Sequence, residues 1–448
     1  MLRLAIILFA LTAGQIAFGQ TASPSIDTHL ADTWRRNGLE PAAPCSDEQF
    51  LRRVSLDLLG RIPTTAEREA FLRSPDRTAL VDQLLEREEF NRFWSELWTT
   101  QLYGYADEST DRQTLADWLH GQLKTRRPYD KIALDLVSAS GESAFTGPVN
   151  FLLRYPEEPV VKVSRAFLGI RLDCARCHDH PFDRWTQADF QRMNKFFDAV
   201  ERREVSNGNT ELVDVVRQVD AAERPRFLSG AEPRTSRWRA EFGLFLTKSR
   251  PFARNFANRI WYHLVGRGIV HPVDDVNRDN PAAAPELLEW LADEAIRTEF
   301  DTRHMVRLVC ASRAYQLAST SAKGDDARVK LFAIRPIKPL TPEQWYESMC
   351  IASGRAAKPE ERTEFVRTFL GDALNGDFSA SWEYRETVQG LMSRLVDDAP
   401  QAAGGTEDLF IRFLGRGPTS AEREALKGRT PREIGYILLH SSEFAFNH

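Results

Sequence analysis

The sequence has few cysteines and, beyond one short segment near its N-terminus, no long apolar run. Five cysteines in 448 residues are too few for a disulfide-dense secreted scaffold. The apolar run from Leu4 to Leu11 is shorter than the roughly 20 residues that a membrane span requires, and no later segment approaches that length. A net charge of −5 gives no general attraction to nucleic acid. Because the phosphate-binding loop, the nucleophile elbow and the H-E-x-x-H zinc motif are also missing, a standard hydrolase is not indicated.

The N-terminal segment has the pattern of an export signal. Arg3 provides a positive charge, the apolar run follows it, and the small residues Ala17 and Gly19 indicate cleavage before Gln20. We therefore expect residues 1–19 to be a signal peptide. The mature chain is then expected to be periplasmic or secreted, with no transmembrane segment.

The most informative motif is Cys174-Ala175-Arg176-Cys177-His178, a C-x-x-C-H run. This is the attachment sequence for c-type haem, in which two thiols form thioethers to the porphyrin. The histidine that follows reaches the iron as its proximal ligand. Haem of this type is attached outside the cytoplasm, so the motif and the export signal agree. The pattern predicts haem c on Cys174 and Cys177, with the iron bound by His178.

Other ligand sets remain open from the sequence alone. The sixth iron ligand is not determined, and Met193, His263 and His271 are the candidates. Zinc, or no cofactor at all, is the alternative to haem, because soft and imidazole donors cluster around the motif. The alternative zinc set consists of Cys174, Cys177, His178, His180 and Asp183. A disulfide between the two motif cysteines is a third interpretation.

Two adjacent acidic residues form a further candidate site. Asp274 and Asp275 follow His271-Pro272 in an expected loop and are candidates for paired carboxylates, since close acids drive their pKa values apart. Adjacent acids in a loop are more often solvated or cap a helix. The sequence does not assign a role to this pair.

Hydrophobic spacing predicts an all-α fold of two packed helical regions with a small β-hairpin between them. Helical patterns include Thr78–Leu102 and Pro159–Leu172, and Asn207-Gly208 is a turn signal between two short strand patterns. Thr64 with Glu67 forms one of the expected capping boxes. The expected division is 1–19 signal peptide, 20–205 N-terminal helical domain, 206–237 linker with the hairpin, and 238–448 C-terminal helical domain.

The two ends of the chain carry an internal repeat. The stretch that starts at Leu59 with LGRIPTTAEREA recurs from Leu414 as LGRGPTSAEREA. Both copies continue in a helical pattern, to Phe90 in the first and Phe444 in the second. We expect a helix–turn–helix unit that is used twice, with the C-terminal domain ending in a copy of the 59–90 unit and the two ends packed near each other.

Two longer stretches carry a resemblance to a known pair of domains. Val161–Phe197, around C-A-R-C-H-D-H-P-F-D-R-W-T, resembles the planctomycete-type cytochrome-like domain with its C-x-x-C-H-x-H-P motif. Arg250–Leu317, which includes FANRIW and PVDD, resembles the domain that usually follows it. The resemblance runs from about Ile26 to the end of the chain. It implies membership of an exported bacterial family whose domains have no assigned function.

The residues together predict an exported redox or electron-transfer protein with covalently attached c-type haem and a periplasmic redox partner. The alternative is a non-haem exported protein. It would be either a metal-dependent enzyme acting on polysaccharide-derived substrates or a structural or binding component. Whether the chain is an enzyme is left open, and no nucleic-acid partner is expected.

Overall fold

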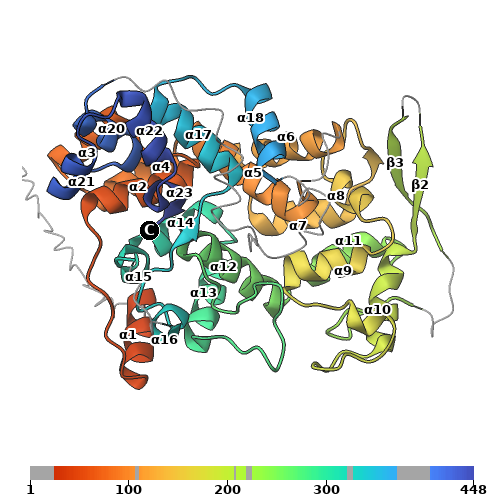
Figure 1. Cartoon of the computed structure of the whole chain (residues 1–448). Coiled ribbons are helices and arrows are strands. Elements are labelled where there is room, and N and C mark those ends of the chain that lie inside the picture. The colour runs from red at the N-terminus through yellow and green to blue at the C-terminus, as the bar shows by residue number, and fades with distance from the viewer. Residues whose placement is uncertain (1–24, 106–109, 206–207, 218–223, 320–325, 371–403) are drawn as a thin grey trace, which may run out of the picture.

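The computed structural model describes residues 25–105, 110–205, 208–217, 224–319, 326–370 and 404–448. Within these ranges the protein is mainly helical with little strand, which confirms the all-α prediction (Figure 1). None of the helices in these ranges is both long and apolar enough to cross a membrane. The predicted signal peptide, residues 1–19, lies outside the described residues.

Ten helices form most of the regular structure in the described part of the first half of the chain. They are α1 (Ile26–Arg36), α2 (Asp47–Leu59), α3 (Thr65–Arg73), α4 (Arg77–Leu85), α5 (Glu88–Tyr103), α6 (Thr110–Lys124), α7 (Tyr129–Ser138), α8 (Val149–Arg154), α9 (Pro159–Val163) and α10 (Gln187–Asn194). Five of them (α1, α2, α3, α4 and α10) begin at a polar N-cap residue whose side chain accepts from a free backbone N–H. The predicted capping box is present, since Thr64 accepts from the Glu67 backbone while the Glu67 carboxylate accepts from the Thr64 backbone.

The second half is built in the same way. Its helices are α11 (Trp238–Thr247), α12 (Arg250–Val265), α13 (Pro285–Arg297), α14 (Thr302–Ala311), α15 (Arg313–Gln316), α16 (Asp326–Lys330), α17 (Pro342–Ser353), α18 (Pro359–Leu370), α20 (Thr406–Leu414), α21 (Ser420–Ala425), α22 (Pro431–Leu439) and α23 (Ser442–Ala445). α12 is buried along most of its length and packs against α13 and α14. It therefore forms the central helix of this half.

The predicted hairpin is present between the two halves. β2 (Val200–Glu204) pairs with β3 (Thr210–Asp214) in antiparallel register, with Val200 opposite Asp214. A short third strand, β1 (Gly141–Glu142), joins the other side of β3 and comes from the stretch between α7 and α8. A second small sheet pairs β4 (Lys338–Pro339) with β5 (Phe446–Asn447).

Two predicted helices differ from those observed. The single helix expected over Thr78–Leu102 is two helices, because α4 ends at Leu85 and Arg87 is extended before α5. The helix expected over Pro159–Leu172 ends early. A π-helical turn, Ser164–Leu168, follows α9, and Gly169 then adopts a left-handed conformation with φ of 70°. A Cβ atom there would stand 2.8 Å from Asn255 Oδ1, so close packing on α12 requires glycine.

The two copies of the repeat pack against each other (Figure 1). α20–α23 at the C-terminal end lie beside α2–α4, and a shared apolar core includes Ile62 from the first copy and Phe444 from the second. Arg52 on α2 is buried and donates to the carbonyl oxygens of Phe413, at 3.0 Å, and Phe444, at 3.1 Å. The C-terminal segment is thus held on the N-terminal helices.

The two copies also repeat one polar arrangement. Arg61 donates to both carboxylate oxygens of Glu67, each at 2.9 Å, and to Glu89. In the second copy, Arg416 donates to both oxygens of Glu422, at 2.9 and 2.8 Å, and also binds Glu443. The recurring sequence therefore specifies a recurring network of ion pairs that locks the turn before α3 and α21.

A larger apolar core runs through both halves of the chain. It includes Ile26 on α1, Trp94 on α5, Trp261 on α12 and Ile334 after α16. The division into domains at 206–237 stays a prediction, since the core is continuous across it. The C-x-x-C-H segment lies at the end of the molecule that carries α10 and the hairpin (Figure 1).

Candidate functional site

The C-x-x-C-H segment forms one exposed turn on the surface. Cys174–Arg176 is a 3₁₀ turn, and Ala175 at its centre is fully buried, which fixes the turn to the core. Cys174 and Cys177 on either side of Ala175 are both exposed and not joined to another cysteine. His178 is exposed as well. All three side chains of the motif are therefore accessible from solvent.

Contacts on both sides of the turn fix its backbone. Before it, Arg165 on the π-helical turn forms an ion pair with Asp173. After it, the Gln187 amide at the start of α10 donates to the Cys177 carbonyl oxygen at 3.1 Å. The Gln187 backbone N–H donates to Asp179 Oδ1 at 2.9 Å. The motif is thus positioned between the end of α9 and the N-terminus of α10, although its side chains are exposed.

The ring of His178 is held in one tautomer. Its Nδ1 lies 2.8 Å from the backbone oxygen of Asp179. A carbonyl oxygen can only accept, so Nδ1 carries the hydrogen in the neutral ring and Nε2 keeps its lone pair. A hydrogen bond of this kind from the second ring nitrogen is typical of histidines that bind a metal. His178 therefore presents Nε2 as a ligand atom.

His180 is held in the opposite tautomer. The backbone N–H of Phe182 donates to His180 Nδ1 at 3.2 Å, so this nitrogen has its lone pair already in use. The His180 backbone N–H also donates to the Trp185 oxygen at 2.8 Å, which closes a tight loop. His180 thus orders the loop after the motif, whereas His178 offers a free ligand atom.

The alternative zinc ligands do not come together in the same way. No group of three or more His, Cys, Asp or Glu side chains in the described ranges is arranged to hold a metal ion. Asp183, for example, accepts from the backbone N–H of Arg184 at 2.7 Å. The predicted set of Cys174, Cys177, His178, His180 and Asp183 is therefore spread along the loop.

The other candidate residues lie in different environments. Met193 is fully buried on α10, the helix that packs against the cysteine turn. His263 and His271 line a separate cavity, whose lining does not include the motif. Asp274 is fully buried and accepts from Arg171 at 3.0 and 3.2 Å. Asp274 is thus a buried carboxylate paired with the partly exposed Arg171, and it is not solvated.

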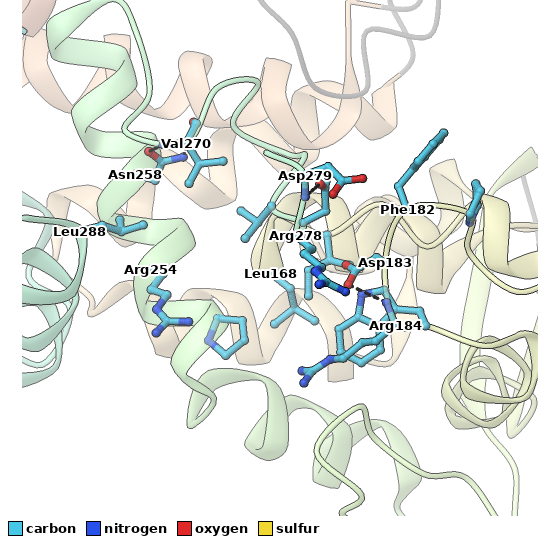
Figure 2. A pocket seen from close by; sticks show the side chains of 16 residues that line it. Leu168, Phe182, Asp183, Arg184, Arg254, Asn258, Val270, Arg278, Asp279 and Leu288 are labelled. Carbon is cyan, nitrogen blue, oxygen red and sulfur yellow. Dashed lines mark hydrogen bonds between the residues drawn. The ribbon is translucent and has the colours of Figure 1, made fainter. Parts of the chain in front are cut away.

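A cavity of about 850 Å³ opens beside the loop that follows the motif (Figure 2). Its apolar lining comes from the loop, the π-helical turn and the second half of the chain: Leu168, Ile170, Phe182, Trp185, Val270, Val276 and Leu288. Phe182 is 64% exposed, which is unusual for a large apolar side chain. The volume is in the range of pockets that hold organic ligands and cofactors.

Three arginines line this cavity, and sequence reasoning missed all of them. Arg254 comes from α12 and Arg184 from the loop on the other side, with Arg278 from the segment after β-bridge residue Asn277 (Figure 2). Arg254 is paired with Glu289 at 2.5 Å, whereas Arg184 and Arg278 have no carboxylate partner among the described residues. Arg184 instead lies over the Trp185 ring, 4.5 Å from its centre. The cavity therefore combines an apolar lining with accessible guanidinium groups.

Two regions of the chain match models of known protein domains. Residues 25–202 match PSCyt2, described as a protein of unknown function (DUF1549), and residues 243–370 match PSD1, described as a protein of unknown function (DUF1553). The chain matches this planctomycete-type pair of domains. No curated protein and no solved structure matches it. The resemblance seen in the sequence is thus confirmed at the level of the two domains, and their descriptions assign neither a cofactor nor a reaction.

Proposed function

We propose that this chain is an exported redox protein that carries c-type haem on Cys174 and Cys177, with His178 as the proximal ligand. One observation carries the proposal. Two accessible thiols flank a buried alanine, and the next histidine has its Nδ1 held by a carbonyl so that Nε2 is left for iron. This donor set fits haem c, since attachment requires two free thiols and one imidazole nitrogen.

The chain's own residues would hold the group and tune it. A bound haem supplies one-electron chemistry at iron, and the protein sets its position and surroundings. The Asp179 carbonyl fixes the orientation of the His178 ring, and Gln187 holds the backbone of the turn. Because His178 is exposed on the surface, a periplasmic redox partner could approach the site from the side of this histidine.

The neighbouring cavity supports the same proposal. Its lining includes Pro181, three residues after His178, although the two cysteines are not part of it. An apolar lining suits the flat body of a porphyrin, and guanidinium groups suit its two propionates. Arg184 and Arg278, which lack carboxylate partners among the described residues, are the side chains we expect to bind them.

The sharpest test compares two histidines in the same loop. The full chain is exported from a host with haem-c maturation machinery, as wild type and as His178→Ala and His180→Ala. We expect His180→Ala to keep the wild-type absorption spectrum, because His180 Nδ1 bonds the Phe182 backbone rather than a ligand. We expect His178→Ala to change the spectrum, because the proximal ligand is removed.

The alternatives give other outcomes in the same experiment. A zinc site would yield a colourless protein whose metal content falls in both variants. A structural or binding component would be colourless and metal-free, and both variants would leave its fold unchanged. A wild-type protein without a haem spectrum contradicts the proposal, as does a spectrum that depends on His180 and not on His178.

A further inference from the structure

A second cavity, of about 300 Å³, lies at the C-terminal end of α12, where residues of α2 and α5 meet β4. Its apolar lining consists of Phe93, Leu97, Ile337 and Pro339. Its polar lining consists of Asp57, Tyr262, His263, His271, Lys338, Thr341 and Gln344. Ile337 is 42% exposed, so the cavity has an accessible edge. None of these residues takes part in the proposed haem site.

The floor of this cavity is a buried carboxylate with a full set of donors. Asp57 is fully buried and accepts from Tyr315 Oη at 2.9 Å, Asn447 Nδ2 at 2.8 Å and Arg335 at 3.2 Å. Lys338 Nζ forms an ion pair with Oδ1 of Asp57, the oxygen that also accepts from Asn447. These four donors satisfy the carboxylate, so Asp57 serves to hold cations at this place.

The cations outnumber the carboxylate. Lys338 and Arg335 both pair with Asp57, and Arg53 lies close enough for its pKa to be affected by Arg335 and Asp57. Asp57 is the one carboxylate that forms an ion pair with either Lys338 or Arg335 in the described part of the chain. A buried cation without a counter-charge raises the free energy of the folded protein. A bound anion at this site would therefore be stabilising.

Donor groups beside the cavity remain unused. Arg335 is fully buried, and its Nε and Nη1 have no hydrogen-bond partner. Nη1 lies 3.8 Å from the point where a Cβ on Gly266 would stand, and Gly266 itself lines the cavity. Lys338 Nζ also donates to the His263 carbonyl oxygen at 2.7 Å, which leaves one of its three N–H groups for a ligand.

We propose that this cavity binds a small organic carboxylate, with its carboxylate at Lys338 and its apolar body against Phe93, Leu97 and Ile337. The surplus positive charge calls for an anion, and charge-assisted hydrogen bonds from Lys338 would be strong in a buried place. The apolar lining favours an organic acid over an inorganic ion, because binding would remove the hydrocarbon surface of the acid from water. The ring of His263 adds no charge, since burial and nearby Lys338 hold its pKa well below the usual range.

The test uses two probes of nearly equal shape, benzoate and benzamide, titrated calorimetrically into the full exported chain. We expect benzoate to bind about tenfold or more tightly than benzamide, because only benzoate has the charge that the site lacks. Lys338→Met is expected to remove this preference. Arg278→Met, which changes the other cavity, is the matched control and is expected to leave it unchanged.

A second variant guards against a folding defect in Lys338→Met, since that change removes a partner of buried Asp57. Ile337→Trp fills the accessible edge of the cavity, leaves every charge in place, and is expected to abolish benzoate binding. Equal binding of benzoate and benzamide overturns the proposal. Benzoate binding that survives Ile337→Trp or is lost in Arg278→Met also overturns it. None of these three results depends on whether the chain carries haem.

Discussion

Replacing Arg61 by methionine should destabilise the fold more than the same change at Arg416, although the two occupy matching positions in the repeat. The Arg61 side chain is 10% exposed and the Arg416 side chain is 32% exposed. Each bonds a glutamate through both oxygens, and each donates to a carbonyl oxygen beside it. The chemistry is therefore the same, and burial is the main difference.

The magnitude follows from the carboxylate that Arg61 holds. Burial opposes ionisation of Glu67, but hydrogen bonds from Arg61 and the Thr64 backbone outweigh it and lower its pKa to about 2. A shift of this size corresponds to roughly 3 kcal/mol, shared among all the groups that bind Glu67. Because Arg87 still binds Glu67 in the variant, we expect Arg61→Met to cost about 2 kcal/mol.

The matching substitution in the second copy of the repeat, Arg416→Met, should lower the free energy of unfolding by less. Hydrogen bonds from Arg416 lower the pKa of Glu422 to about 2 as well, but solvent screens this more exposed pair. We expect Arg416→Met to cost about 1 kcal/mol or less. The assay is urea unfolding at pH 7, followed by circular dichroism, with the free energies compared between the two variants. An equal or larger cost for Arg416→Met would refute the argument from burial.

The same pair predicts a pH dependence of known sign. Glu67 has a lower pKa in the folded chain than the ordinary 4.5, so its contribution is complete above about pH 4.5 and is lost as the pH falls toward 2. The difference in unfolding free energy between wild type and Arg61→Met should therefore shrink over this interval. A difference that stays constant from pH 7 to pH 2 would show that the network does not act through the Glu67 charge.

The remaining predictions concern thiols and packing. In a chain expressed without haem-c maturation, a thiol reagent should label Cys174 and Cys177 rapidly and the three buried cysteines only after unfolding, whereas a matured chain should show no rapid labelling. Arg52→Met should cost about 3 kcal/mol, because carbonyl oxygens of the C-terminal copy lose a buried donor, and hydrogen exchange should rise in α20–α23. Unchanged exchange there would contradict this. Gly169→Ala should destabilise the chain by roughly 1–3 kcal/mol in urea unfolding, since φ is 70° and Asn255 is too close, and a neutral result would contradict the need for glycine.

Local patterns in the sequence predicted most of the helices and the hairpin. The capping residue Thr64 indicated where a helix begins, because a side chain and a backbone group three residues apart determine a cap. The break between α4 and α5 was missed, since the apolar spacing continues across Arg87 and does not reveal one extended residue. The early end of the helix after α9 was missed because it depends on the approach of Asn255 from α12.

The motif itself could be found from the sequence, but the hydrogen bonds of its histidines could not. Spacing alone does not show that His178 Nε2 is available and that His180 Nδ1 is already bonded, because both depend on the folded loop. The Asp57 network was beyond local reasoning, since its donors stand 258 and 390 residues away at Tyr315 and Asn447. The arginines of the large cavity likewise come from segments that meet only in the fold.

The most direct test of the central proposal is the mass of the exported full chain under denaturing conditions, recorded together with its absorption spectrum. Covalent haem at Cys174 and Cys177 predicts a mass increased by one haem and a Soret band that stays with the denatured chain. Both should vanish in Cys174→Ala/Cys177→Ala and persist in the control Cys350→Ala, which removes a buried thiol. A colourless chain of unmodified mass, exported from a host that matures other c-type cytochromes, would contradict the proposal.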